Sequence, residues 1–562
     1  MALLALLWSL ALTITGGIAI ETGWRLISSR NAVRPLVAGL VLVAWYVAVW
    51  RRHWREDLGR YSTPAPWPRF LASLAILVAL IVGFGWGTRI AAGPDQSGYV
   101  SQAAMFARGE ITVPAPAWSR NAPWDDAAFS ASPVGWAPTH QTHILAPIYS
   151  PGLPLIMAAF ERAAGPGAVF YVVPILGAVL VWSTYLLGSR LDGPWVGAIA
   201  AVLVASSPTF LLMQQQAMSD VPVSAFLTLS IALALGGSSI LAGLSAAIVV
   251  LIRPNLVPLV VFPLALLLLR LGGRRQVTLR GHALWHAFLF AIPVGVAATV
   301  IAALNWRYHG SPLLSGYGPL SAYYSIEGIG TNLRQYSRWF VEGHTPIALA
   351  GMGAVLAAGS DRARRLAIAL VTLGLPLSLL AIYMPYMVFH DYDWGSLRFL
   401  LPGYPGLFAG FGILVTSIVI RARHRVRAAW VGVALVGFVS AWGWTYAVRS
   451  GVFMQRVGDA RYARAVEYAR QLPRRSVILS NAHSGTLRFY TGVDVLRFEA
   501  IRPWEVDTAV AHLRRLGYAL FFLGDEFELE QFRTRFAGTH TLAALGAKPR
   551  DAFDGVVVYD VR

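Results

Sequence analysis

The sequence contains no cysteine, so it forms no disulfide and has no thiolate that could attack a substrate or bind a metal. It is also poor in charge, because only 13% of its 562 residues are Asp, Glu, Lys or Arg. A soluble protein of this length carries more charge than that. The chain also lacks a short-period repeat, a low-complexity tract and a coiled-coil heptad pattern. These absences exclude thiol chemistry and argue against a soluble globular protein.

What the sequence has instead is hydrophobic residues, which make up 56% of the chain and give a mean hydropathy of +0.56. Repeated apolar runs of about 20 residues predict a polytopic α-helical membrane protein. About thirteen membrane helices are expected, at 2–20, 35–50, 70–92, 168–187, 194–213, 221–237, 239–252, 255–270, 284–304, 345–358, 366–386, 402–420 and 428–448. The first run has no basic segment before it, so we do not expect a cleaved signal peptide.

The net charge of +18 comes almost entirely from arginine, and the arginines gather in short loops between the apolar runs. These clusters lie at Arg51–Arg52, Arg270–Arg280, Arg362–Arg365 and Arg421–Arg427. The positive-inside rule places them in the cytoplasm of a bacterial cell, with the chain crossing its inner membrane several times. The segments then expected on the periplasmic side are 93–167, 214–220, 305–344, 387–401 and everything after 449. The loop 21–34 carries three arginines yet falls outside, against the rule.

The composition changes after Gly451, where the sequence takes on a soluble pattern. Three short apolar strands are expected, at Ser476–Ser480, Ala519–Leu523 and Gly555–Tyr559. Helices are expected between and beside them, at Asp459–Gln471, Trp504–Leu516 and Glu526–Phe536. This alternation predicts a small α/β domain with a largely parallel sheet outside the cytoplasm. No strand is followed by a GxGxxG or Walker pattern, so we expect no nucleotide, and no basic face is interleaved with aromatics as nucleic-acid binding requires.

A polar stretch, Gly93 to Glu110, directly follows the apolar run at 70–92 and organises the rest of the chain. Asp95, Tyr99 and Gln102 fall on one face of the helix predicted there. A carboxylate at the membrane surface can take a proton from an acceptor held in water, which makes Asp95 a candidate general base. The alternative is that Asp95 simply caps this helix.

Three further charged residues emerge on the same predicted side of the membrane. Asp220 begins a helix, where it can act as a second catalytic carboxylate, help to bind a divalent cation, or cap the helix. Arg253 interrupts two apolar runs and suits a phosphate, or extends to the lipid headgroups. Arg398 is a second outer cation, for which pairing with the nearby Asp393 is the alternative.

Aromatic and histidine side chains in the outer loops complete the candidate substrate-binding set. Tyr317 belongs to the segment NWRYHGSPLLSGYG, which suits a sugar phosphate but equally an interfacial aromatic belt. His140 and His143 stand three residues apart, between two prolines and without a third ligand nearby. We expect hydrogen bonding from His143 in this loop, and no zinc site.

Taken in order, these segments resemble the GT-C glycosyltransferases, in particular the bacterial protein O-mannosyltransferases and lipid A aminoarabinose transferases. The resemblance rests on GPDQSGYVSQAAMFARG, IYSPGLPLIMAAF, SPTFLLMQQQAMSDVP, LIRPNLVPL, NWRYHGSPLLSGYG and LRFLLPGYP. It covers roughly residues 70–420. It divides the chain into two extra N-terminal helices (1–69), a GT-C transmembrane domain (70–448) and a C-terminal domain (449–562).

The resemblance implies an inverting membrane glycosyltransferase that moves a sugar from a polyprenyl-phosphate donor to a lipid, polysaccharide or protein acceptor. Asp95 matches the acidic residue of the first outer loop, which is the catalytic base of the family, and Asp220 matches the acidic residue of the second. Arg253 and Arg398 match positions where cations meet the lipid phosphate. Asp95 is followed by Gln96, where many relatives have a second carboxylate, so we expect no metal cofactor.

Two other classes of protein remain as alternatives. A transporter would use the break at Arg253-Pro254-Asn255 as a binding site, although transporters usually show such breaks in pairs. A non-catalytic scaffold of envelope assembly would tolerate loss of Asp95.

Overall fold

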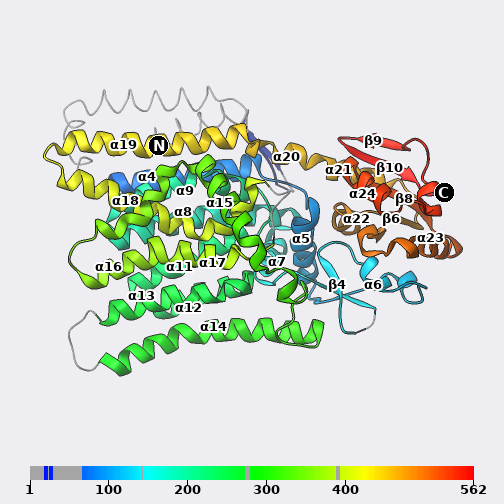
Figure 1. Ribbon diagram of the computed structural model, residues 1–562, viewed down its shortest axis with the longest axis horizontal. Helices are drawn as coiled ribbons and strands as arrows, with labels where there is room; N and C mark the ends of the chain where they lie inside the picture. Colours follow the sequence, from blue (N-terminus) through cyan, green and yellow to red (C-terminus); the bar gives the residue numbers. More distant parts are fainter. Residues whose placement is uncertain (1–17, 23–24, 30–65, 142, 273–278, 388–392) are drawn as a thin grey trace.

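The structure, a computed structural model, describes residues 18–22, 25–29, 66–141, 143–272, 279–387 and 393–562. Figure 1 shows a bundle of long helices lying side by side, with a smaller α/β unit at one end. The first outer segment lies between the two. Most of the two predicted N-terminal membrane helices falls outside the described residues. Residues 18–20, the end of the first, belong instead to strand β1 (Ile18–Thr22), which pairs antiparallel with β2 (Arg25–Ser29).

Each of the other predicted membrane segments contains helix. The bundle comprises α4 (Pro66–Trp86), α8 (Val169–Asp192), α9 (Pro194–Ala205), α10 (Pro208–Met213), α11 (Asp220–Gly236), α12 (Ser239–Ile252), η3 (Pro254–Val260), α13 (Val261–Gly272), α14 (Leu279–His309), α15 (Ile329–His344), η6 (Pro346–Leu356), α16 (Arg362–Ala369), η7 (Leu370–Gly374), α17 (Leu375–Tyr383), η8 (Trp394–Gly403), α18 (Tyr404–Arg421) and α19 (Arg425–Arg449). In the described residues, six helical stretches are long and apolar enough to cross a membrane, and five apolar helices are shorter. Within the described residues, some of the predicted spans are therefore too short to cross a membrane by themselves.

Proline explains part of this difference. The expected helix 194–213 is two helices, α9 and α10, and Ser207 caps α10 while Pro208 begins it. The break occurs there because proline supplies no N–H to continue the preceding helix. The expected helix 70–92 ends at Trp86, and Gly87 to Ala92 connect it to the next helix without helical structure. An irregular backbone at such a position is tolerated where it is buried in protein or lines a cavity.

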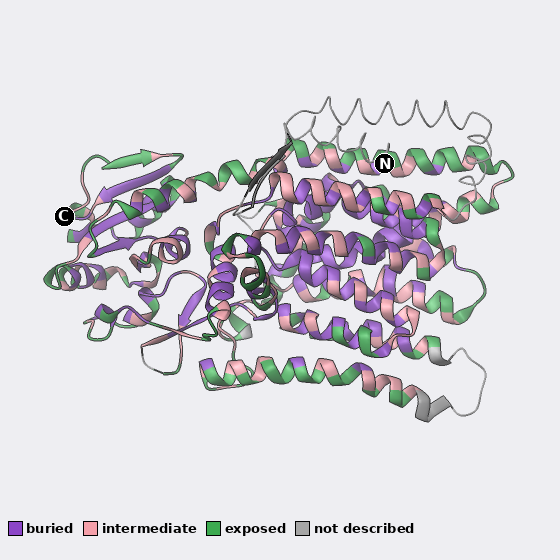
Figure 2. Cartoon of the chain, turned by 180° about the vertical axis from the view of Figure 1, so that it is seen from behind, coloured by how far each residue is buried: buried purple, intermediate pink, exposed green. Residues whose placement is uncertain are grey.

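The interior of the bundle is built from helices α4, α8, α9, α11 and α18, whose buried side chains form one continuous apolar core. Figure 2 shows buried residues concentrated there and exposed ones along α14 and α19. The apolar window of α14 is only 11% buried, against 67% for Trp394–Arg421. An apolar helix that leaves most of its surface uncovered suits lipid as its surroundings, which agrees with a membrane protein.

The first outer segment is ordered rather than loop-like. Helix α5 (Gly93–Ala107) is followed by β3 (Val113–Pro114), η1 (Ala117–Ser119), α6 (Ala127–Ser130), β4 (Trp136–Pro138) and β5 (Ile144–Pro147), and the strands form a small antiparallel sheet in the order β3-β5-β4. Helix α7 (Gly152–Ala164) includes most of the segment IYSPGLPLIMAAF, and Pro151 immediately precedes it.

The α/β unit has a five-stranded sheet in the order β7-β6-β8-β10-β9. Its elements are α20 (Gln455–Gly458), α21 (Ala460–Arg470), β6 (Ser476–Leu479), α22 (Ser484–Thr491), β7 (Asp494–Leu496), η10 (Phe498–Ala500), η11 (Pro503–Glu505), α23 (Val506–Arg515), β8 (Ala519–Asp525), α24 (Glu526–Arg535), α25 (His540–Ala543), β9 (Asp551–Phe553) and β10 (Val556–Asp560). Strands β7, β6 and β8 are parallel, whereas β10 and β9 are antiparallel. The sheet is thus mixed, because a short β9–β10 hairpin adds two strands without a crossover helix.

Tryptophans of the first outer segment bind it to the α/β unit. Trp118 and Trp124 are buried in the apolar core on one face of the five-stranded sheet. The indole N–H of Trp118 donates to Asp494 Oδ2 at 3.1 Å, and Asp125 pairs with Arg502 at 2.6 Å. The α/β unit therefore packs directly on the segment that carries Asp95.

Candidate active site

Asp95 lies in the first turn of α5, where the chain turns through Gly93, with φ of +65°, and Pro94 at the helix start. The helix cap is Ala92, so Asp95 is not the cap residue that the sequence allowed. Its Oδ1 accepts a hydrogen bond of 2.8 Å from the hydroxyl of Tyr149. Its Oδ2 lies 3.4 Å from the guanidinium of Arg398. The side chain remains 38% exposed, so this carboxylate is held in position while staying open to solvent.

Tyr149 is fixed by close packing between β5 and α7. Its ring lies against Tyr99 at 4.6 Å between centroids and meets Tyr317 edge-on at 6.0 Å. Gly98 and Gly135 line the ring on the side where a Cβ atom would collide with it. Burial raises the pKa of Tyr149 well above its ordinary value near 10, and the charge of Asp95 adds to this shift. The phenol therefore stays protonated and donates to the carboxylate.

A second, largely buried polar network lies next to this pair. The hydroxyl of Tyr99 donates to Ser219 Oγ at 3.0 Å, and Arg253 Nε donates to the same oxygen at 3.0 Å. Arg253 also forms an ion pair of 2.6 Å with Asp220 Oδ1, where Asp220 is 0% exposed and Arg253 is 12% exposed. Burial raises the pKa of Tyr99 to about 12, so it remains a donor in this network.

The two arginines approach one aromatic ring. Arg253 and Arg398 lie over Phe399, with 5.6 and 5.0 Å from each guanidinium carbon to the ring centroid. Arg253 comes from the break between α12 and η3, and Arg398 from η8. Two cations at this separation from a common ring, beside a half-exposed carboxylate, form a site that favours an anionic group.

The structure brings most of the predicted residues together. Asp95 and Arg398 are in contact, and Asp220, Arg253 and Tyr99 form the adjoining network. Gln102 is buried and donates to the backbone oxygen of Tyr149 at 3.2 Å. These residues come from α5, from α11, from the break between α12 and η3, and from η8, which are far apart in the sequence.

Three predicted residues lie where direct contact with a substrate is not evident. Asp220 is buried, its Oδ1 is ion-paired with Arg253 and its Oδ2 has no hydrogen bond, so its contact in the structure is with Arg253. Gln102 lies beneath Tyr149 and is 1% exposed, which fits support of that ring better than substrate contact. His143 has a positive φ of 67°, and its Nδ1 is buried without a hydrogen bond. Its backbone oxygen accepts from the N–H of Ala115.

Sequence reasoning missed Tyr149 and Ser219, which link the charged residues. Ser219 stands beside Asp220 in the sequence and so could have been included with it. Tyr149 gives no signal of its own, because aromatic residues are frequent in the outer segments and only the fold shows which one touches Asp95. Within the described residues, the one group of three side chains that could hold a metal ion lies elsewhere, in the α/β unit.

Replacing Tyr149 by Phe removes one hydrogen bond and keeps the ring. A hydrogen bond to a charged group is worth about 1.5–3 kcal/mol, and 1.4 kcal/mol is a factor of ten, so we expect the turnover rate to fall roughly tenfold to a hundredfold. Because the hydroxyl positions Asp95, kcat should fall while KM for the donor stays near the wild-type value. Steady-state kinetics measures both, and a change confined to KM would contradict this role.

Gly98 offers an independent test of the same contact. A methyl group at Gly98 would meet the ring of Tyr149, since Cδ2 and Cε2 of that ring already lie where the Cβ atom would be placed. We expect Gly98→Ala to push the phenol away from Asp95 and to lower kcat at least as much as Tyr149→Phe. Gly167→Ala is the matched control, because the added methyl would meet nothing within 4 Å. Equal activity of the two alanine variants would show that the ring can move without effect.

No family model matches the chain, and no curated protein matches it. Solved structures do. The structure of ArnT from Cupriavidus metallidurans bound to undecaprenyl phosphate superposes with a TM-score of 0.54 at 13% identity, covering 88% of this chain and 98% of that one. The archaeal oligosaccharyltransferase AglB from Archaeoglobus fulgidus, in complex with an inhibitory peptide and a dolichol-phosphate, gives 0.50 at 12% identity, covering 88% and 74%.

A third structure extends the similarity. The arabinofuranosyltransferase AftD from Mycobacteria gives a TM-score of 0.50 at 13% identity and covers 88% of this chain but 40% of its own. All three neighbours are GT-C glycosyltransferases, as the resemblance of the polar segments predicts. At these identities the comparison shows the fold alone. The chain therefore has the GT-C glycosyltransferase fold.

Proposed function

We propose that this protein is a membrane glycosyltransferase that transfers a sugar from a polyprenyl-phosphate donor to a hydroxyl acceptor. The observation that carries the proposal is the half-exposed carboxylate of Asp95, held by Tyr149 and placed beside the cation of Arg398. Transfer with inversion needs a base on the acceptor and positive charge on the leaving phosphate. Both groups stand in this one site.

In the proposed reaction, Asp95 accepts the proton of the acceptor hydroxyl. The hydroxyl oxygen then bonds to the anomeric carbon of the sugar while the bond from that carbon to the phosphate oxygen breaks. The polyprenyl phosphate leaves with the electron pair of the broken bond. Arg398 and Arg253 offset the negative charge that develops on it, with Asp220 and Ser219 fixing the guanidinium of Arg253.

Two neighbours support a lipid-phosphate donor, since one was solved with undecaprenyl phosphate and another with a dolichol-phosphate. The uncovered apolar surface of α14 agrees with a protein that lies within lipid. The arginine clusters favour a topology in which the start of α5 and the α/β unit lie on the outer face of the cytoplasmic membrane. The acceptor is then a lipid, glycan or protein on that face, where Tyr317, 41% exposed, is positioned to contact it.

The proposal is tested by incubating purified protein in membranes with a panel of radiolabelled polyprenyl-phosphate sugars. Transfer of label from one donor to a lipid, polysaccharide or protein fraction is the expected result, and it identifies the sugar and acceptor class together. Release of label as free sugar, without any acceptor product, would show hydrolysis instead. Failure with every donor, by protein shown to be folded, would favour a transporter or an assembly scaffold.

A further inference from the structure

The sheet of the α/β unit has a point where the strand order reverses, and the proposed reaction does not use it. Strands β6 and β8 are parallel neighbours, but the chain leaves β6 through α22 to β7 on one side and returns through α23 to β8 on the other. The buried side chain of Leu487 in α22 packs on one face of the sheet, and those of α23 pack on the opposite face. In open α/β sheets, ligands bind outside the carboxyl ends of the strands at such a reversal.

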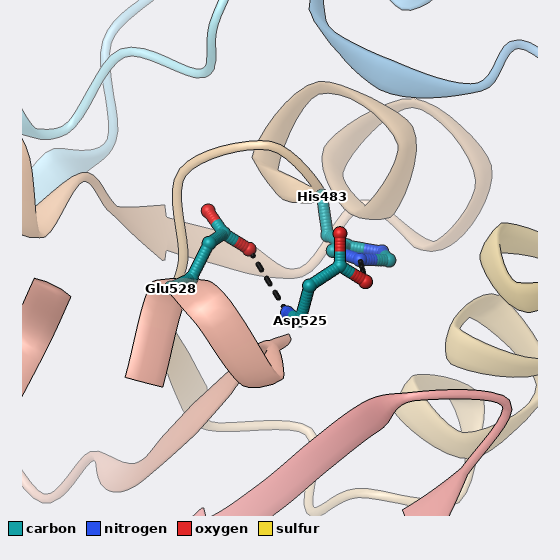
Figure 3. Close-up of side chains that lie close together, drawn as sticks. All are labelled: His483, Asp525 and Glu528. Atoms are coloured by element: carbon teal, nitrogen blue, oxygen red, sulfur yellow. Dashed lines mark hydrogen bonds and ion pairs between the residues drawn. The ribbon is translucent and has the colours of Figure 1, made fainter. Parts of the chain in front are cut away.

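Three side chains with metal-binding groups meet at that point, as Figure 3 shows. His483 lies on the connection from β6 to α22, Asp525 ends β8, and Glu528 lies in the first turn of α24. One ligand atom of each lies within 4.8 Å of the others. Their exposed fractions are 0, 4 and 1%, so the group is enclosed by protein.

The distance between the imidazole and the nearer carboxylate fits a shared ion. His483 Nε2 and Asp525 Oδ1 are 3.2 Å apart. Two ligands at about 2.0–2.1 Å from a tetrahedral zinc ion stand roughly 3.3 Å from one another, so the pair already has the spacing of one edge of such a site. The same distance also permits a direct hydrogen bond, so the spacing alone does not decide between the two arrangements.

The hydrogen bonds within the group leave capacity for a ligand. Glu528 accepts from the backbone N–H of Ala482 through Oε1 and from that of Asp525 through Oε2, which uses two of its four lone-pair positions. Asp525 is also the N-cap of α24, in a capping box with Glu528, and its buried Oδ2 accepts no hydrogen bond. Buried polar atoms are normally satisfied, so this oxygen has room for a further partner.

The local charge points to a cation as that partner. Asp525 and Glu528 bring two carboxylates into one enclosed space. Besides His483, Arg461 also pairs with Asp525. Its guanidinium stands 3.5 Å from Asp525 Oδ2, and its side chain is 38% exposed. Buried charges are stable when they are paired or when they coordinate a metal. A mixed set of one imidazole and two carboxylates suits a divalent transition ion such as zinc.

We propose that His483, Asp525 and Glu528 form a structural zinc site at the carboxyl ends of β6 and β8. The residues that follow His483 dock on the catalytic segment: Ser484 Oγ accepts from the N–H of Val134 at 3.0 Å, and Thr486 Oγ1 donates to the oxygen of Ala91 at 2.6 Å. Gly485 packs against Ser97, which lies two residues after Asp95 in α5. The ion would fix this connection and so hold the α/β unit against α5. This inference does not depend on the proposed transfer reaction.

The test is the metal content of the purified full-length protein in detergent, equilibrated with zinc and then freed of unbound ions. Wild-type protein is expected to retain about one zinc ion per chain, because enclosed structural sites release zinc slowly and bind it tightly. His483→Gln and Asp525→Asn are each expected to lose it. His540→Gln removes an exposed histidine of the same unit and should retain the ion. A chelator should also lower the unfolding midpoint of the wild type, and added zinc should restore it.

Two results would overturn the proposal. The first is wild-type protein that lacks stoichiometric zinc and whose unfolding midpoint changes with neither zinc nor chelator. The three side chains would then form a hydrogen-bond network without an ion. Zinc retained in both His483→Gln and Asp525→Asn would place the ion elsewhere. If these variants do not fold, the wild type loaded with Co²⁺ replaces them, since a tetrahedral site with these ligands gives visible absorption and a purely hydrogen-bonded group gives none. Each measurement reads metal, not transfer, so its failure is distinct from failure of the proposed function.

Discussion

Replacing Asp95 by Asn is expected to lower sugar transfer by roughly 10²- to 10⁴-fold, the usual contribution of a general base. The amide has the size of the carboxylate, and its oxygen can still accept the hydrogen bond from Tyr149. What it cannot do is accept a proton from the acceptor hydroxyl. The loss should therefore appear in kcat for transfer, while binding of the lipid donor, measured separately, changes little.

The matched control is Asp126→Asn, in the same outer segment. Asp126 is exposed and lies in the left-handed region with φ of 50°, a conformation that Asn also tolerates. The Asp126→Asn variant should retain the full rate of sugar transfer. If Asp95→Asn also retains the full rate, Asp95 is not the base, and the proposed mechanism fails even if the protein proves to be a glycosyltransferase.

Removing Asp220 is expected to produce the largest loss of stability in the membrane domain. Asp220→Ala would leave the guanidinium of Arg253 buried without its counter-charge, and breaking a buried pair from one side costs about 3–5 kcal/mol. Chemical denaturation in detergent measures this as a lower unfolding midpoint. Arg338→Gln is the surface control: its ion pair with Glu342 is exposed, so the midpoint should stay unchanged.

A double variant separates stability from function at this position. Asp220→Ala with Arg253→Met removes both charges, and it should recover much of the lost stability because no unpaired charge remains. Transfer should not recover with it, since the cation proposed to meet the leaving phosphate is gone. Recovery of both would mean that the pair is structural only. Failure of the double variant to regain stability would mean that packing, not charge, makes Asp220 necessary.

The sequence predicted the helical membrane class and the positions of most helices, because apolar runs and proline breaks act locally. It was less successful at helix ends and lengths. The runs at 194–213 and 70–92 looked continuous by hydropathy, whereas the structure divides the first at Ser207-Pro208 and ends the second at Trp86. Hydropathy reports the environment of a residue, and a buried irregular segment is as apolar as a buried helix.

The candidate site shows the same division. Asp95 and Arg398 could be selected from the sequence, because a charge at a membrane boundary is costly and therefore informative. Their partners could not be. The sequence left open a local pairing of Arg398 with Asp393, whereas the structure pairs Arg398 with Asp95, and Asp393 accepts from the N–H of Gly395.

The sequence by itself determined that this protein is a helical membrane protein with polar outer segments of the GT-C pattern, and it selected the carboxylate and arginines of the site. The tertiary structure decided which of them act together. It buried Asp220 against Arg253, left Asp95 exposed beside Tyr149, and packed the α/β unit on the start of α5. Composition and spacing act over a few residues, but exposure and pairing depend on side chains brought together from distant parts of the chain.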